Sequence, residues 1–239
     1  MNRDRLSSFI QNDGGSDLEK VFSKEELSKF DGLHGSKEPL YLAILGLVFD
    51  VTQGAKHYQP DASYHAFTGR DGSKAFITGD FTEDGLTDDI SDLDKDDLMS
   101  LFDWTKMYEK NYIFKGVVEG RFYSSDGKPT LFLKDIQNKI REVEDEKKLS
   151  KQYEQKYPPC NVEWTQEEGS RVWCSTKSGG VVRNWVGVPR KYYEPGASTY
   201  RCACINFREG QNDESVRHGM VEMYKECPAK SQSCRVMET

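Results

Sequence analysis

Cysteine is missing from the first two-thirds of this 239-residue chain, and long apolar runs are missing from all of it. A helix needs about 20 mostly apolar residues to cross a bilayer, so no membrane span is expected. The start, MNRDRLSSFIQNDGG, also lacks the apolar core of a secretory signal. Positive charge is not in excess, because 33 Lys and Arg stand against 40 Asp and Glu. The net charge of -7 argues against nucleic acid or an anionic membrane as the main partner.

The cysteines that are present gather in the last third of the chain. They are Cys160, Cys174, Cys202, Cys204, Cys227 and Cys234. An even number confined to one segment is typical of a disulfide-bonded module in an oxidising compartment. A zinc site and a set of reduced cysteines are the alternatives, but the segment has no Cys-x-x-Cys motif and one histidine, His218. The sequence favours disulfides and leaves their pairing open.

Composition divides the chain into four regions. Residues 1–19 are polar and glycine-bearing, 20–125 predict an α+β domain, 126–159 a helical linker, and 160–239 a cysteine-rich module. Early in the second region, Ser23 and Glu26 have the spacing of a capping box, which predicts a short helix ending near Gly32. LYLAILGLVFDVT follows and predicts two short strands joined by a tight turn at Gly46.

The later elements are indicated by the spacing of apolar residues. DLDKDDLMSLFDWTKMYEKN predicts a helix. Its apolar face combines Leu93, Leu98, Leu101, Phe102, Trp104 and Tyr108. FKGVV then predicts a strand, and LFLKDIQNKIREVEDEKKLSKQYEQKYPP a helix that ends before Pro158 and Pro159. WCSTKSGGVVRNWVGVPRKYY predicts a hairpin with a glycine turn.

The stretch KHYQPDASYHAFTGRD, residues 56–71, holds the candidate metal ligands. His57 and His65 could bind a heme iron as a pair. Alternatively Tyr64 or Tyr58 could bind as a tyrosinate, because ferric iron stabilises a phenolate whose free pKa is about 10. In a purely structural interpretation the aromatic residues fill a core, and the Arg-Asp pair at 70–71 caps a helix.

Several motifs in order resemble those of the membrane-associated progesterone receptor family, which has cytochrome b5-like domains. The motifs are LGLVFDVT, HYQPDASYHAFTGRDGSKAF and DWTKMYEKNYIFKGVVEGRFY, and together they cover about residues 20–125. The family's Phe-x-Gly-Arg-Asp-x-Ser-x-Ala falls on Phe67, Gly69, Arg70, Asp71, Ser73 and Ala75. The resemblance implies a cytochrome b5-like domain that binds heme b.

The same resemblance implies roles for individual residues. The axial tyrosine of the family falls on Tyr64, and a second pocket tyrosine falls on Tyr58. The heme-facing Lys-Tyr pair falls on Asn111 and Tyr112, and heme is expected to bury against Phe67 as well. Asn111 departs from the pattern, since it removes a cation that could pair with a heme propionate.

The turn before the axial tyrosine also departs from the family. Relatives have Gly-Pro-x-Gly-Pro there, whereas this chain has QPDAS at 59–63, which predicts a stiffer turn with a negative charge at Asp61. The His-Pro-Gly-Gly ligand motif of electron-transfer cytochromes b5 is absent. This favours tyrosinate ligation by Tyr64 over ligation by His57 and His65.

The cysteine-rich tail extends the resemblance. PPCNVEWTQEEGSRVWCSTKSGGVVRNWVGVPRK is similar to the tail of an extracellular, heme-binding member of the same family. This implies a secreted protein, not an enzyme, that promotes neuronal differentiation and has a cell-surface partner. The alternatives are a b5-like electron-transfer protein and a heme-free extracellular module that binds proteins. Steroid binding, suggested by the family's name, has no residue pattern in this chain.

Overall fold

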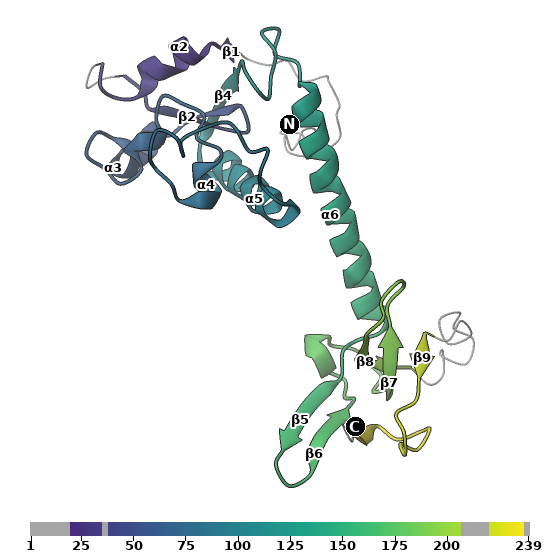
Figure 1. Cartoon of the computed structure of the whole chain (residues 1–239). Coiled ribbons are helices and arrows are strands. Elements are labelled where there is room, and N and C mark those ends of the chain that lie inside the picture. The colour runs from purple at the N-terminus through teal and green to yellow at the C-terminus, as the bar shows by residue number, and fades with distance from the viewer. Residues whose placement is uncertain (1–19, 35–37, 207–219, 237–239) are drawn as a thin grey trace. The chain divides into compact units, whose positions relative to one another are not determined.

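The computed structural model describes residues 20–34, 38–206 and 220–236, so the predicted polar segment at 1–19 lies outside the described residues. The chain divides into two compact units, Met1–Asp145 and Glu146–Thr239. The division falls within helix α6 (Leu131–Lys156), the long helix drawn in Figure 1. Each unit is described by itself below.

The first unit is built on a four-stranded sheet. Its strands are β1 (Val21–Phe22), β2 (Tyr41–Ile44), β3 (Leu47–Asp50) and β4 (Ile113–Val118). The order is β1-β4-β3-β2, with β1 parallel to β4 and the other pairs antiparallel. Leu45 and Gly46 form the turn between β2 and β3 with φ angles of 52° and 76°, the left-handed region that tight hairpin turns require. The predicted pair of strands is confirmed.

Short helices and one long helix surround this sheet. They are α2 (Lys24–Leu27), η1 (Ser28–Phe30), η2 (Thr52–Gly54), α3 (Ala55–Tyr58), η3 (His65–Phe67), α4 (Ala75–Thr78) and α5 (Lys95–Asn111). The Ser23 hydroxyl accepts a hydrogen bond of 3.0 Å from the backbone N–H of Glu26, which confirms the predicted cap. Asp94 caps α5 in the same way, through the N–H of Asp97 at 2.9 Å. The predicted α+β class is confirmed.

Strand β2 is buried on both faces of the sheet. Its side chains point alternately into two apolar clusters, one on each face. Leu42 and Ile44 pack with the helices, while Tyr41 and Ala43 pack with α2 on the opposite face. Trp104 departs from the predicted buried face of α5, since it is 41% exposed and packs by one side against Phe76, 5.8 Å away between ring centroids.

Helix α6 packs into the first unit by its start, and Tyr153 near its end packs against Tyr192 of the second unit. Leu133, Ile136, Ile140 and Val143 are buried in the first unit, whereas most of the residues after Val143 are exposed. The helix ends at Lys156, before the predicted proline stop. Among the described residues, no helix is both long enough and apolar enough to cross a membrane.

The second unit contains two three-stranded sheets, ordered β10-β6-β5 and β8-β7-β9. Their strands are β5 (Asn161–Thr165), β6 (Gly169–Trp173), β7 (Val188–Tyr193), β8 (Tyr200–Ile205), β9 (Val221–Glu222) and β10 (Ser233–Val236). The hairpins are β5-β6 and β7-β8, both antiparallel.

The predicted hairpin within residues 173–193 is therefore wrong, because β6 and β7 belong to different sheets. The chain between them passes through η4 (Ser178–Gly180) and an irregular loop. The Arg183 guanidinium holds that loop by donating to the carbonyls of Ser178, Val181 and Val186. These side-chain bonds satisfy backbone groups that a hairpin would have paired across its strands.

All six cysteines form disulfides, as predicted: Cys160 with Cys202, Cys174 with Cys204, and Cys227 with Cys234. They form the core of the module together with Val172 and Tyr224. The sulfurs of Cys160, Cys174 and Cys204 lie within 4.8 Å of one another because two disulfides are adjacent. Zinc binds thiolates, and sulfurs already joined in disulfides are not thiolates, so this group does not support the zinc alternative.

Candidate functional site

A tight turn brings Tyr58 and Tyr64 together. After α3 ends, the Ala62 N–H donates to the Gln59 carbonyl at 3.0 Å, and Asp61 takes a φ of 71°. A residue following proline with this φ is typical of a type II turn, where glycine is preferred. The Tyr64 N–H then donates to the His57 carbonyl at 3.0 Å. The reversal leaves the rings of Tyr58 and Tyr64 6.3 Å apart between centroids.

The two tyrosines belong to a larger group of rings from four elements and a loop, which we call the aromatic cluster. It comprises Tyr58, Tyr64, Phe67, Phe76, Phe81, Tyr108 and Tyr112. Phe67 is buried and lies 6.4 Å from Tyr64 and 5.2 Å from Phe81. Tyr64 and Phe81 are 46% and 43% exposed. The cluster therefore has a buried base and an exposed aromatic edge, which suits a flat apolar ligand.

Buried phenols lie behind this edge. The hydroxyl oxygens of Tyr58 and Tyr108 are 2.6 Å apart and hydrogen-bonded. Burial raises the pKa of Tyr108 to about 12 and raises that of Tyr58 further, with the neighbouring phenols adding to the effect on Tyr58. Burial thus favours the protonated form of both phenols.

Gly54 leaves space beside these phenols. A β-carbon at this position would lie 3.0 Å from the Tyr112 hydroxyl oxygen and 3.1 Å from the Tyr58 ring. Glycine therefore lets both rings approach the backbone at the end of η2. The missing side chain at Gly54 therefore helps to set the positions of the two rings that are predicted to face the heme.

Tyr64 lies at the exposed edge of the cluster. It is the most exposed tyrosine of the cluster, and no hydrogen bond among the described residues engages its hydroxyl. The residues of the cluster thus fit a heme held by Tyr64, with Tyr58, Phe67 and Tyr112 along the buried side.

The remaining predicted residues lie less favourably. The Asn111 side-chain N–H donates to the Met107 carbonyl at 2.8 Å, so its amide is used within α5. The Nε2 atom of His65 lies 2.8 Å from the Asp31 carbonyl and must donate to it, which removes that nitrogen as an iron ligand. His57 is exposed, with its ring 6.4 Å from that of Tyr58. The structure does not favour a histidine pair.

Three residues of the cluster, Tyr108, Phe76 and Phe81, have no predicted role in the site. Tyr108 precedes Tyr112 by one helical turn, so its spacing could have suggested that both rings lie on one face. Phe76 and Phe81 follow the family motif, but neither has a local pattern that separates it from a core residue.

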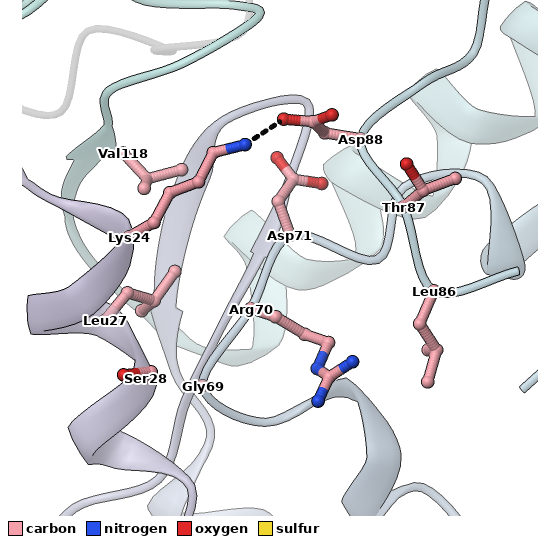
Figure 2. A pocket seen from close by; sticks show the side chains of 10 residues that line it. All are labelled: Lys24, Leu27, Ser28, Gly69, Arg70, Asp71, Leu86, Thr87, Asp88 and Val118. Carbon is pink, nitrogen blue, oxygen red and sulfur yellow. Dashed lines mark hydrogen bonds and ion pairs between the residues drawn. The ribbon is translucent and has the colours of Figure 1, made fainter. Parts of the chain in front are cut away.

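A separate cleft of about 330 Å³ lies elsewhere in the first unit (Figure 2). It is lined by residues of α2 and η1, by 69–71, by 86–88 and by Val118. Lys24 reaches across it to Asp88, with 2.9 Å between Nζ and Oδ2 (Figure 2). The cleft has no aromatic lining and includes none of the predicted heme contacts, so it is distinct from the aromatic cluster.

Comparison with known proteins first defines the class. Residues 23–121 match the family described as "Cytochrome b5-like Heme/Steroid binding domain". A hypothetical protein from Arabidopsis thaliana, described as having a cytochrome b5 like fold, is 30% identical; the match covers 45% of this chain and 97% of that one, with a TM-score of 0.40. The family match shows that residues 23–121 form a cytochrome b5-like domain.

Whole-chain relatives then identify the family. The chain is 45% identical to human neuferricin over 227 residues, which covers 90% of this chain and 85% of that protein. It is 44% identical to neuferricin of Danio rerio over 216 residues, covering 90% and 79% of the two chains. The chain belongs to the neuferricin family.

Proposed function

We propose that this chain is a secreted heme-binding protein that holds heme b through the phenolate of Tyr64. The neuferricin family and the cytochrome b5-like domain support heme binding. The observation that carries the ligand assignment is the exposed Tyr64 hydroxyl at the edge of a buried aromatic cluster. Tyr58, Phe67 and Tyr112 supply the apolar and phenolic wall against which the ring packs.

The ligand type determines what the site does. Heme supplies a ferric iron when bound, and an anionic phenolate stabilises that state over the ferrous one. We assign Tyr64 to the iron because it is 46% exposed at the edge of the cluster, whereas Tyr58 and Tyr108 are buried. We therefore propose heme binding, carriage or sensing rather than rapid electron exchange or catalysis.

Secretion and signalling are the wider part of the proposal. Three disulfides in the second unit support an oxidising compartment. The role in promoting neuronal differentiation follows from the resemblance to the extracellular family member. A cell-surface protein would be the partner, and the disulfide-bonded module is the proposed surface for it.

The test is the absorption spectrum of the full chain reconstituted with hemin, recorded for the wild type and for Tyr64→Phe, His57→Ala and His65→Ala. We expect a five-coordinate, high-spin ferric spectrum that Tyr64→Phe abolishes and the histidine variants retain. Tyr41→Phe is the matched control, because Tyr41 lies in the apolar cluster on the other face of the sheet. A six-coordinate low-spin spectrum lost in a histidine variant would support electron transfer, and absence of hemin binding would support the protein-binding module.

A further inference from the structure

We infer that Tyr108 is a positioning residue of the heme site, which holds the hydroxyl of Tyr58 inside the domain and away from the oxygen of Tyr64. The inference rests on the function proposed above. The resemblance used for Tyr58, Tyr64 and Tyr112 does not include Tyr108. Its role follows from the contacts of its ring and hydroxyl.

The position of Tyr108 is determined by packing on several sides. It is 3% exposed, and its ring centroid lies 5.8 Å from that of Phe49, 5.6 Å from Phe76 and 5.1 Å from Tyr112. A ring surrounded in this way has one available rotamer, so its hydroxyl oxygen has a defined place. That oxygen lies 2.6 Å from the hydroxyl of Tyr58.

The Tyr58 hydroxyl is the group that this bond controls. Tyr58 is 6% exposed, so its hydroxyl has little access to water and needs a partner within the protein. Tyr108, which is buried, supplies that partner, while Tyr64 lies in the exposed edge with its ring centroid 6.3 Å from that of Tyr58. The bond to Tyr108 therefore keeps the Tyr58 hydroxyl from donating to the iron ligand.

Removing the Tyr108 oxygen would change this arrangement. The Tyr58 hydroxyl would lose this partner, and of the remaining acceptors, the phenol of Tyr112 and an iron-bound phenolate, the phenolate is the stronger. A hydrogen bond to the Tyr64 oxygen withdraws electron density that it would otherwise donate to iron. The phenolate-to-iron transition then requires more energy, and the ferric state is less favoured.

The experiment uses the full chain with hemin and four variants: Tyr108→Phe, Tyr58→Phe, the two combined, and Tyr41→Phe as a control. For Tyr108→Phe we expect the phenolate-to-iron band at shorter wavelength and a higher midpoint potential, with hemin affinity changed by less than about threefold. The double variant should return both values to those of the wild type, because it has no Tyr58 hydroxyl to donate. A purely structural role for Tyr108 would give no such reversal.

A second measurement needs no heme. In the heme-free chain, Tyr108→Phe should shift the NMR resonance of the Tyr58 ring carbon that bears the hydroxyl, and Tyr41→Phe should not. An unshifted band and potential in Tyr108→Phe, or a shift that persists in the double variant, would overturn the inference while leaving the Tyr64 assignment intact. If Tyr64→Phe left the band unchanged, the proposed function and the inference would fail together.

Discussion

The carboxylate of Asp71 accepts a hydrogen bond of 2.7 Å from the backbone N–H of Gly46, 25 residues earlier in the chain. Its other oxygen accepts from the N–H of Ser73 at 3.0 Å and from the Ser73 hydroxyl at 2.5 Å. These bonds tie the turn between β2 and β3 to the segment that joins Phe67 and Phe76 of the aromatic cluster. Asp71, part of the Phe-x-Gly-Arg-Asp motif, is therefore a structural anchor.

Asp71 should make the stability of the protein depend on pH. Burial raises its pKa from 3.8 to about 6, so the folded state binds a proton more tightly than the unfolded chain. The associated stability is complete below about pH 4 and is lost as the pH rises through 6, and it amounts to at most about 3 kcal/mol. We expect urea unfolding between pH 4 and 7 to show this slope in the wild type and not in Asp71→Asn. Parallel pH profiles for the two proteins would contradict the assignment.

Replacing Asp61 by glycine should stabilise the turn before Tyr64. Asp61 has a φ of 71°, which costs energy for any residue with a β-carbon. We expect Asp61→Gly to raise the free energy of unfolding by about 0.5–1 kcal/mol, measured with urea. Ala62→Gly is the matched control, since Ala62 has no left-handed φ and the change should destabilise the protein. Destabilisation by both substitutions would show that the turn is not strained at Asp61.

Gly54→Ala should have a larger effect on heme affinity than on the free energy of unfolding. The φ of Gly54 is -96°, which alanine adopts freely, so the effect comes from the added methyl group alone. Because that carbon would lie 3.0 Å from the Tyr112 hydroxyl, Tyr112 or Tyr58 must shift. We expect hemin affinity to fall about tenfold in titrations. Lys56→Ala, an exposed change two residues away, should bind hemin normally, and equal affinities for both variants would exclude the proposed pocket.

The disulfides should differ in their contribution to stability. Cys160 and Cys202 are 42 residues apart, whereas Cys227 and Cys234 are 7 apart. On chain entropy alone, replacing the first pair by serine should cost about 4 kcal/mol and the second about 2.4 kcal/mol. Urea unfolding followed by tryptophan fluorescence would measure both, with hemin binding expected to persist because the aromatic cluster lies in the other unit. The opposite order of stabilities would argue against an entropic origin.

Local signals in the sequence were sufficient for much of the fold. The Ser23 cap, the strands on either side of Gly46 and the end of α6 before Pro158 each depend on a few adjacent residues. Resemblance added Tyr58, Tyr64 and Phe67, which the structure brings into one cluster. Their roles toward heme stay predictions, as does that of Asn111.

The strand pairing and the disulfide pairing of the second unit could not be predicted from local signals in the sequence. The hairpin predicted across 173–193 failed because alternating apolar residues identify strands without identifying their partners, and β6 pairs with β5 and β10 instead. The disulfide pairing was open for the same reason, since six cysteines in one segment do not show which are adjacent after folding.

The sequence by itself determined several elements of the first unit and that the cysteines pair, and the family resemblance selected Tyr64 as the candidate ligand. Only the tertiary structure decided that Tyr58 and Tyr108, 50 residues apart, share a hydrogen bond. It also decided that His65 turns to Asp31 and that Asn111 bonds within its own helix. Caps and strands follow from interactions within one or two turns of chain, whereas the partner of a buried hydroxyl depends on how distant segments pack together.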